Sequence, residues 1–326
     1  MSKSVAVLKA RQAILGALLS VAVTAVSGQT FPSRPVHMVT AEPGGGTDVV
    51  ARLIAQALTT NLGQQVVVEN KGGASGIIAA QTVAKAPADG YTLLIYSATL
   101  WILPYLRDNV PYDPVRDFSP IIAAASSPNI LVVHPTVPAN SVRELIALVK
   151  SKPGELTYGS GGSGTTLHLS AELFKAMAGL NILHVPFKSG GAAQTALLGG
   201  QLNMMFPVAA GAMPQVKAGK LRVLAVTSAQ QSVLVPDVPT MAASGLPGYA
   251  SELIVGVFAP AGTPAPLITR LNQEFVRVLT QADMKEKFLG VGVEPRGGTP
   301  EQMVAIVKSD MAKWGKVIKE AGIRAD

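Results

Sequence analysis

Short apolar runs alternate with amphipathic stretches along most of the chain, and this alternation predicts an α/β protein. In the N-terminal part, the apolar runs of strand length are Val36–Thr40, Gln65–Glu69 and Tyr91–Ser97. Helical periodicity over about Asp48–Leu62 and Ala74–Ala86 separates these runs. Repeats of strand, helix and strand are typical of βαβ units, so we expect a parallel sheet.

A second alternating series follows. Its predicted elements are helix Ser141–Ser151, strand Thr157–Gly159, helix Thr165–Ala178, strand Ile182–Val185, helix Gly191–Gly199, strand Leu202–Phe206, helix Ala212–Ala218 and strand Arg222–Thr227. Between the two series, Ser126–Pro128 separates the apolar runs Pro120–Ala125 and Asn129–Val133, which predicts a crossing between domains. Glu252–Ala259 is interpreted as the strand that returns. The predicted closing helices are about Ala265–Gln281, Asp283–Leu289 and Pro300–Glu320.

Two α/β halves with two crossings predict a hinged clamshell, in which two doubly wound domains enclose a cleft. The length of 326 residues agrees with two domains. We expect the first domain to comprise residues 28–125 and 252–326, and the second to comprise residues 126–251.

The N-terminus has the order of a secretory signal peptide. Basic residues up to Arg11 precede the apolar run Ala13–Val26, and Ala25 and Ser27 are small residues at A-x-A-like positions. A run of about 14 apolar residues is shorter than the roughly 20 that span a bilayer. We therefore expect residues 1–27 to be a cleaved signal and the mature protein to reach the periplasm.

Composition narrows the possible chemistry. The chain has no cysteine, which excludes disulfides and thiolate metal ligands. Its net charge of +7 is spread without a dense basic run, so we expect no nucleic-acid partner. Four scattered histidines (His37, His134, His168 and His184) lack metal-ligand spacing, and we expect them to be packed or exposed at the surface. We expect no metal and no cofactor.

Two glycine-rich segments stand where a strand leads into a helix. They are Glu42–Asp48 and Tyr158–Thr166. A helix start presents unpaired N–H groups that bind carboxylate or phosphate. The alternative for the first segment is a tight turn in which Thr47 or Asp48 caps the helix. Neither segment matches a nucleotide-binding loop.

Two further segments also end predicted strands. In His184–Gly191, Phe187 or Lys188 could touch a ligand. The alternative is that Phe187 is packed in the core and Lys188 is solvated. Tyr96–Thr99 offers small hydroxyl side chains that either donate into a cleft or cap the segment that follows. Because ligands of open α/β sheets lie at the carboxyl ends of strands, these segments join the candidate site.

The ordered set of motifs resembles the periplasmic solute-binding proteins of tripartite tricarboxylate transporters, the Bug or TctC-like family. The matching stretches, from Phe31 towards the C-terminus, are 31–36, 43–48, 51–52, 66–71, 88–94, 184–191, 197–201, 217–222 and 237–240. The resemblance implies two α/β domains that hold a carboxylate in their cleft with amides, hydroxyls and water. Carried over to this chain, it points to Gly45, Thr47, Asp48, Ser97, Thr99, Ser160, Ser163, Gly164, Thr165, Phe187 and Gly190.

The sequence departs from the family pattern at two positions. Thr40-Ala41 stands where the family usually has Pro-Phe, so a methyl group replaces a ring beside the ligand. Pro207 follows Phe206 where relatives often have Asp, which disfavours an amino-acid ligand. We expect a di- or aromatic carboxylate.

The leading hypothesis is a monomeric, non-enzymatic receptor that captures a small organic acid and presents it to membrane transporter subunits. One alternative is an exported enzyme that uses Asp48 or a histidine as general base. No paired nucleophile and base supports it. Another is a ligand sensor for a membrane receptor, which would have the same cleft.

Overall fold

The computed structural model describes residues 31–41, 43–44 and 46–324. The predicted signal peptide, residues 1–27, lies outside the described residues, as do Glu42 and Gly45. None of the helices in the described ranges combines the length and apolar character that a membrane span needs.

The chain divides into two units, Met1–Arg34 and Pro35–Asp326, and both of its sheets lie in the second unit. The first sheet has the strand order β11-β4-β10-β3-β1-β2. These strands are β1 (Val36–Thr40), β2 (Val66–Asn70), β3 (Thr92–Ser97), β4 (Phe118–Pro128), β10 (Glu252–Pro260) and β11 (Glu294–Gly297). The central strands β3, β4 and β10 are mostly buried, as expected of strands covered on both faces.

The second sheet has the order β7-β6-β8-β5-β9. Its strands are β5 (Ile130–Val133), β6 (Thr157–Ser160), β7 (Leu183–Pro186), β8 (Met204–Met205) and β9 (Arg222–Val226). The helices are α2 (Gly46–Leu62), η1 (Ala74–Gly76), α3 (Ile77–Ala84), α4 (Thr99–Leu106), α5 (Val142–Ser151), α6 (Thr166–Ala178), α7 (Gly190–Leu198), α8 (Ala209–Lys217), α9 (Ala265–Leu279), α10 (Ala282–Gly290) and α11 (Pro300–Ala321). The α/β class predicted from the sequence is confirmed.

The parallel pairing predicted for the three N-terminal strands is confirmed, but both complete sheets are mixed because other strands add antiparallel pairs. In the first sheet β1, β2 and β3 are parallel, whereas β10 is antiparallel to both β3 and β4. In the second sheet β6, β7 and β8 are parallel, whereas β5 is antiparallel to β8 and β9. β10 and β5 are the strands that the chain forms directly after it crosses from the other sheet. Each enters its new sheet without a helix before it and pairs antiparallel with the strands on both of its sides.

The crossing itself lies later than predicted. β4 runs without a break through Ser126–Pro128, because these residues pair with β10 and, at Ser126, with β11. The first sheet thus includes three residues that the sequence-based division placed in the second domain. The chain passes to the second sheet at Asn129, whose backbone amide and carbonyl both bond to the Thr227 hydroxyl.

Two elements were missing from the sequence-based prediction, α4 and β11. In addition, the predicted helix Ala74–Ala86 is broken, since Ser75 and Gly76 have φ values of 56° and 82°. The predicted strand Leu202–Phe206 is reduced to Met204–Met205.

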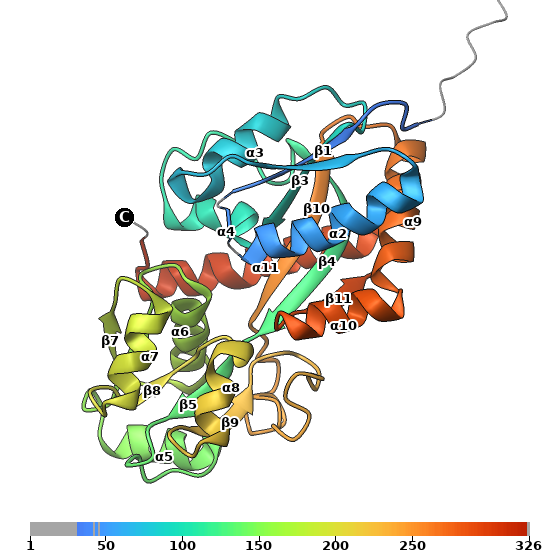
Figure 1. Ribbon diagram of the computed structural model, residues 1–326. Helices are drawn as coiled ribbons and strands as arrows, with labels where there is room; N and C mark the ends of the chain where they lie inside the picture. The colour runs from blue at the N-terminus through green and yellow to red at the C-terminus, as the bar shows by residue number, and fades with distance from the viewer. Residues whose placement is uncertain (1–30, 42, 45, 325–326) are drawn as a thin grey trace, which may run out of the picture. The chain divides into compact units, whose positions relative to one another are not determined.

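The last long helix, α11, packs against elements of both sheets. It contacts α4 and β4, and also α6 of the second sheet (Figure 1). Its start has a capping box between Thr299 and Gln302 and its end has Gly322 in the left-handed conformation. One buried cluster accordingly includes Phe258 of β10, Trp314 of α11 and Phe174 of α6.

Candidate functional site

The first glycine turn connects β1 to α2 (Figure 1). Gly44 has a φ of 73°, a left-handed conformation that glycine adopts without steric cost. Thr40, at the end of β1, donates from Oγ1 to Thr47 Oγ1 at 3.2 Å, which ties the helix start to the strand end. A Cβ added at Gly44 or Gly46 would meet no heavy atom within 4 Å, so the turn is open on that side.

Asp48 holds this turn from within the helix. Its carboxylate Oδ2 accepts from Gly44 N at 2.8 Å and from Arg52 Nε at 3.0 Å, and Oδ1 accepts from Asn70 Nδ2 at 2.8 Å. Burial acts to raise the pKa of Asp48, but the hydrogen bonds from Arg52, Gly44 and Asn70 outweigh it, and the pKa is lowered. Because α2 already begins at Gly46, neither Thr47 nor Asp48 is its N-cap.

The predicted hydroxyl pair lies where β3 passes into α4. Ser97 is buried, and its Oγ donates to Thr99 Oγ1 at 3.0 Å. The intervening Ala98 donates its N–H to the Ile254 carbonyl at 2.9 Å. This bond fixes the turn to β10.

The second glycine loop, residues 160–165, connects β6 to α6 and is closed by its own hydrogen bonds. Ser160 Oγ accepts from Gly162 N at 3.1 Å. Thr165 is the N-cap of α6, and its hydroxyl donates to Gly162 O at 2.8 Å. Ser163 is exposed, and neither its amide nor its hydroxyl has a hydrogen-bond partner among the described residues.

The loop of Phe187–Gly190 lies directly against the second glycine loop. Phe187 donates its N–H to Ser160 O at 3.0 Å and its ring is half-buried. A Cβ on Gly161 would come within 2.8 Å of Gly190 N, so only glycine fits there. The structure therefore brings together six predicted residues: Ser160, Ser163, Gly164, Thr165, Phe187 and Gly190.

The predicted residues of the first sheet form separate groups. In the described ranges, no hydrogen bond joins Thr47, Asp48, Ser97 or Thr99 to the second glycine loop. The second loop instead meets the end of α4, the helix that starts at Thr99. A Cβ on Gly164 would lie 2.8 Å from Leu106 Cδ1. Gly45 is outside the described residues.

A stack of three rings, which was not predicted from the sequence, lies beneath the second loop. The Tyr158 and His184 rings are 4.7 Å apart and the His184 and His168 rings 4.2 Å apart, within 13° of parallel. Burial lowers the pKa of His168 to about 4 and also lowers that of His184. The available signal was position: His184 lies in the strand before Phe187, and His168 is three residues after the capping Thr165.

The residues at both departures from the family pattern are packed. Thr40 and Ala41 are buried, at 0% and 3% exposure. Pro207 accepts from Ile130 N at 2.9 Å, and Phe206 O accepts from Asn129 Nδ2. These two bonds fix the end of β8 to the crossing segment.

The fold and the paired strand-end loops define the class: an α/β binding protein with two sheets joined by two crossings. Residues 50–323 match the family model described as "Tripartite tricarboxylate transporter family receptor". The chain belongs to this family.

Individual relatives agree with that assignment. Protein BugT of Bordetella pertussis is 35% identical over 317 residues, which cover 96% of this chain and 97% of BugT. The solved structure of Rhodopseudomonas palustris Rpa4515 with adipate is 40% identical, with a TM-score of 0.73, and the match covers 90% of this chain and 99% of that one. MatC from the same organism, with bound malate, is 31% identical with a TM-score of 0.69, covering 88% and 100%.

Proposed function

We propose that this protein is an extracytoplasmic receptor that binds a small organic acid through its carboxylate and presents it to the membrane subunits of a tripartite tricarboxylate transporter. Family membership supports the receptor role. The adipate and malate in Rpa4515 and MatC support a dicarboxylate as the class of solute. The apolar leader of residues 13–26 supports export to the periplasm.

The observation that carries the proposal is the second glycine loop. Its exposed tip offers the Ser163 amide and hydroxyl at the start of α6, where the helix dipole favours an anion. The neutral rings beneath it add no negative charge, so a carboxylate meets no repulsion from that side. The first glycine turn supplies the corresponding helix start from α2.

In this proposal the two domains, residues 28–128 with 252–326 and residues 129–251, close over the solute. The solute stabilises the closed state because only that state offers both helix starts at once. The crossings at Asn129 and near Glu252 act as hinges. A methyl group at Ala41 and Pro207 after Phe206 favour a di- or aromatic carboxylate over an amino acid.

The proposal assigns no catalytic step to the site. Asp48, the candidate general base, has both oxygens occupied and a lowered pKa, so it is a weak proton acceptor. His168 and His184 lie beneath the loop and have lowered pKa values, so they too are weak bases.

A thermal-shift screen of mono-, di- and aromatic carboxylates, amino acids and sugars tests the proposal. A solute at 100 times its Kd stabilises the folded state by about 2.7 kcal/mol, which raises Tm by several degrees. We expect dicarboxylates such as adipate and malate to do so, and Ser163→Trp to abolish the shift by filling the loop tip. Ser151→Trp, on an exposed helix end, is the matched control and keeps the shift. Stabilisation by sugars alone would contradict the proposal.

A further inference from the structure

The amide of Gly164 is already committed to a histidine. Gly164 N donates to His168 Nδ1 at 3.0 Å, and Gly164 itself has a φ of 78°. Nδ1 must therefore be unprotonated, which leaves the proton of the neutral ring on Nε2. Gly164 thus belongs to the binding loop without having its N–H available to a solute.

A second histidine holds the other end of the same loop. His184 Nε2 lies 2.7 Å from Ser160 Oγ, and this hydroxyl in turn accepts from Gly162 N. The two imidazoles are stacked at 4.2 Å, so each fixes the plane of the other. Two rings from different elements, His184 of β7 and His168 of α6, consequently fix the backbone conformation of the loop.

We propose that His168 is a positioning residue for the solute-binding loop: its neutral ring holds the Gly164 amide so that the tip at Ser163 faces the solute. This inference rests on the proposed function. A proton on Nδ1 replaces an acceptor with a donor opposite the Gly164 N–H, and the loop loses its anchor. Solute affinity then falls, although His168 does not touch the solute.

Burial and the positive groups that face His168 favour its neutral form, and Glu172, with Oε1 3.9 Å from His168 Nε2, opposes them. Burial is the largest cause of its lowered pKa, and the charges of His184 and Lys175 act in the same direction, whereas Glu172 opposes them. The charge of Glu172 is compensated: Oε1 accepts from Tyr158 Oη at 2.5 Å and from Lys175 Nζ at 2.7 Å. From α4, the residue against the loop is the apolar Leu106.

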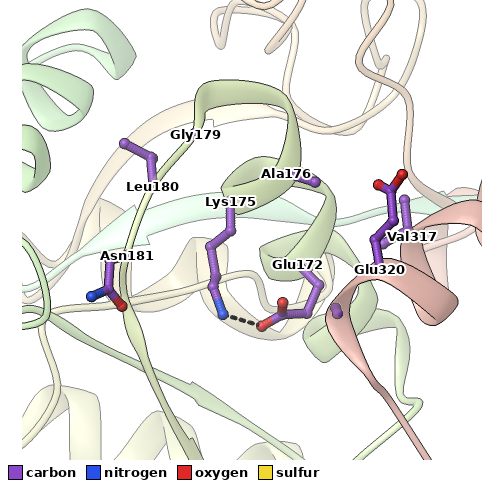
Figure 2. Close-up of a pocket in the computed structure, with 9 residues that line it drawn as sticks. Glu172, Lys175, Ala176, Gly179, Leu180, Asn181, Val317 and Glu320 are labelled. Carbon is purple, nitrogen blue, oxygen red and sulfur yellow. Dashed lines mark hydrogen bonds and ion pairs between the residues drawn. The ribbon is translucent and has the colours of Figure 1, made fainter.

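Figure 2 shows the Lys175–Glu172 ion pair and the pocket that these two residues line. Lys175 and Glu172 pair at the edge of a pocket of about 560 Å³ between α6 and α11, which is also lined by Asn181 and Glu320. Glu172 thus both accepts from Tyr158 of the ring stack and lines this pocket. The charge of Lys175 lowers the pKa of His168 and so acts against the effect of Glu172.

The acid dependence has a definite sign. The pKa of His168 is about 4 in the folded protein and about 6.5 in an unfolded chain, so the unfolded chain binds the proton more tightly. The stability that the neutral ring supplies is complete above about pH 6.5 and is lost as pH falls towards 4. In the folded protein, the Gly164 anchor is lost as pH falls through about 4.

Two variants separate the acceptor from the ring. His168→Phe keeps a stacked ring but has no acceptor, whereas His168→Asn keeps an acceptor near the position of Nδ1 and cannot take up a proton. We expect His168→Phe to weaken adipate and malate binding about tenfold at pH 7 by calorimetry, a loss of about 1.4 kcal/mol. We expect His168→Asn to recover most of that loss. His134→Phe, at a histidine bonded to Thr136 elsewhere, is the control and leaves affinity unchanged.

The decisive readout is the Gly164 amide, measured by NMR in the solute-free protein. We expect its hydrogen-exchange protection to drop at least tenfold in His168→Phe, to return in His168→Asn, and to be lost in the wild type as pH falls through about 4. Imidazole nitrogen shifts are expected to report the Nε2–H tautomer. A folded His168→Phe protein with wild-type Gly164 protection and wild-type affinity would overturn the inference.

The two proposals fail in different ways. If neither acid binds the wild-type protein, the proposed function fails, while Gly164 protection still decides whether His168 anchors the loop. If His168→Phe does not fold, the wild-type tautomer and the pH course of Gly164 protection decide the question without it. A wild-type His168 that carries its proton on Nδ1 would contradict the inference on its own.

Discussion

The first glycine turn and the second glycine loop have the same backbone hydrogen-bond pattern but use different side chains as acceptors. In each, a glycine with positive φ donates its N–H to the side chain four residues later, Gly44 to Asp48 and Gly164 to His168. The acceptor is a carboxylate in the first turn and a neutral imidazole in the second. The same local geometry therefore places a negative charge at the first turn and no charge at the second loop.

In the proposed site, the two loops would prepare a helix start for an anion in different ways. A bare carboxylate beside an anionic solute would repel it, and the first turn offsets Asp48 with Arg52, one turn further along α2. The second loop needs no counterion because its acceptor is uncharged. We infer that the first turn depends on electrostatics and the second on packing, and this contrast makes the following predictions.

The largest effect is expected from Asp48→Ala. This change removes the acceptor of three hydrogen bonds to a buried carboxylate, and we expect the free energy of unfolding to fall by about 3 kcal/mol in urea titrations. Asp283→Ala, which removes an exposed i,i+4 pair with Lys287, is the control and should change stability by less than about 0.5 kcal/mol. Equal losses in both variants would refute the role assigned to Asp48.

A smaller loss of stability is expected from an alanine substitution in the tightly packed second loop than from Asp48→Ala. In Gly161→Ala the new Cβ meets the Gly190 backbone, and we expect a loss of about 2 kcal/mol together with weaker solute binding. The same change at the first turn, Gly46→Ala, meets open space and should leave stability unchanged or raise it slightly. Calorimetric unfolding of both proteins checks the contrast. If Gly46→Ala is as damaging as Gly161→Ala, the first turn is packed as tightly as the second.

The smallest effect is expected from the helix cap of the second loop. Thr165→Ala removes the hydroxyl that accepts from His168 N and donates to Gly162 O, and we expect a loss of about 1 kcal/mol. Thr165→Ser retains the hydroxyl and should restore most of this loss in the same urea titration. A Thr165→Ser protein as unstable as Thr165→Ala would assign the effect to the lost methyl group instead.

Elements with a clear period could be predicted from the sequence. β1, β3 and β10 are apolar runs, and α11 has an amphipathic pattern with both of its ends marked by residue type. Helix α4 could not be predicted in this way, because TLWILPYL is apolar on nearly every side and contains Pro104. β11, with the sequence EPRG, has no apolar alternation, and pairing with β4 alone makes it a strand.

The parts of the candidate site also differed in how far they could be predicted from the sequence. Glycine-rich segments at strand ends could be located because their composition is local. For the ring stack, sequence position places His168 and His184 next to the candidate loops. It does not show that they stack with Tyr158, since the three residues come from α6, β7 and β6 and meet only in the folded chain. β4 continues through the break predicted at Ser126–Pro128 because these residues pair with β10, a strand far away along the chain.

An NMR titration of the labelled protein with adipate and with malate tests the central claim most directly. The account predicts that the backbone amides of Gly44 and Ser163 shift together with one saturation curve, because one solute bridges both helix starts. Shifts at only one of these loops, or shifts confined to the pocket of Glu172 and Glu320 in Figure 2, would contradict it.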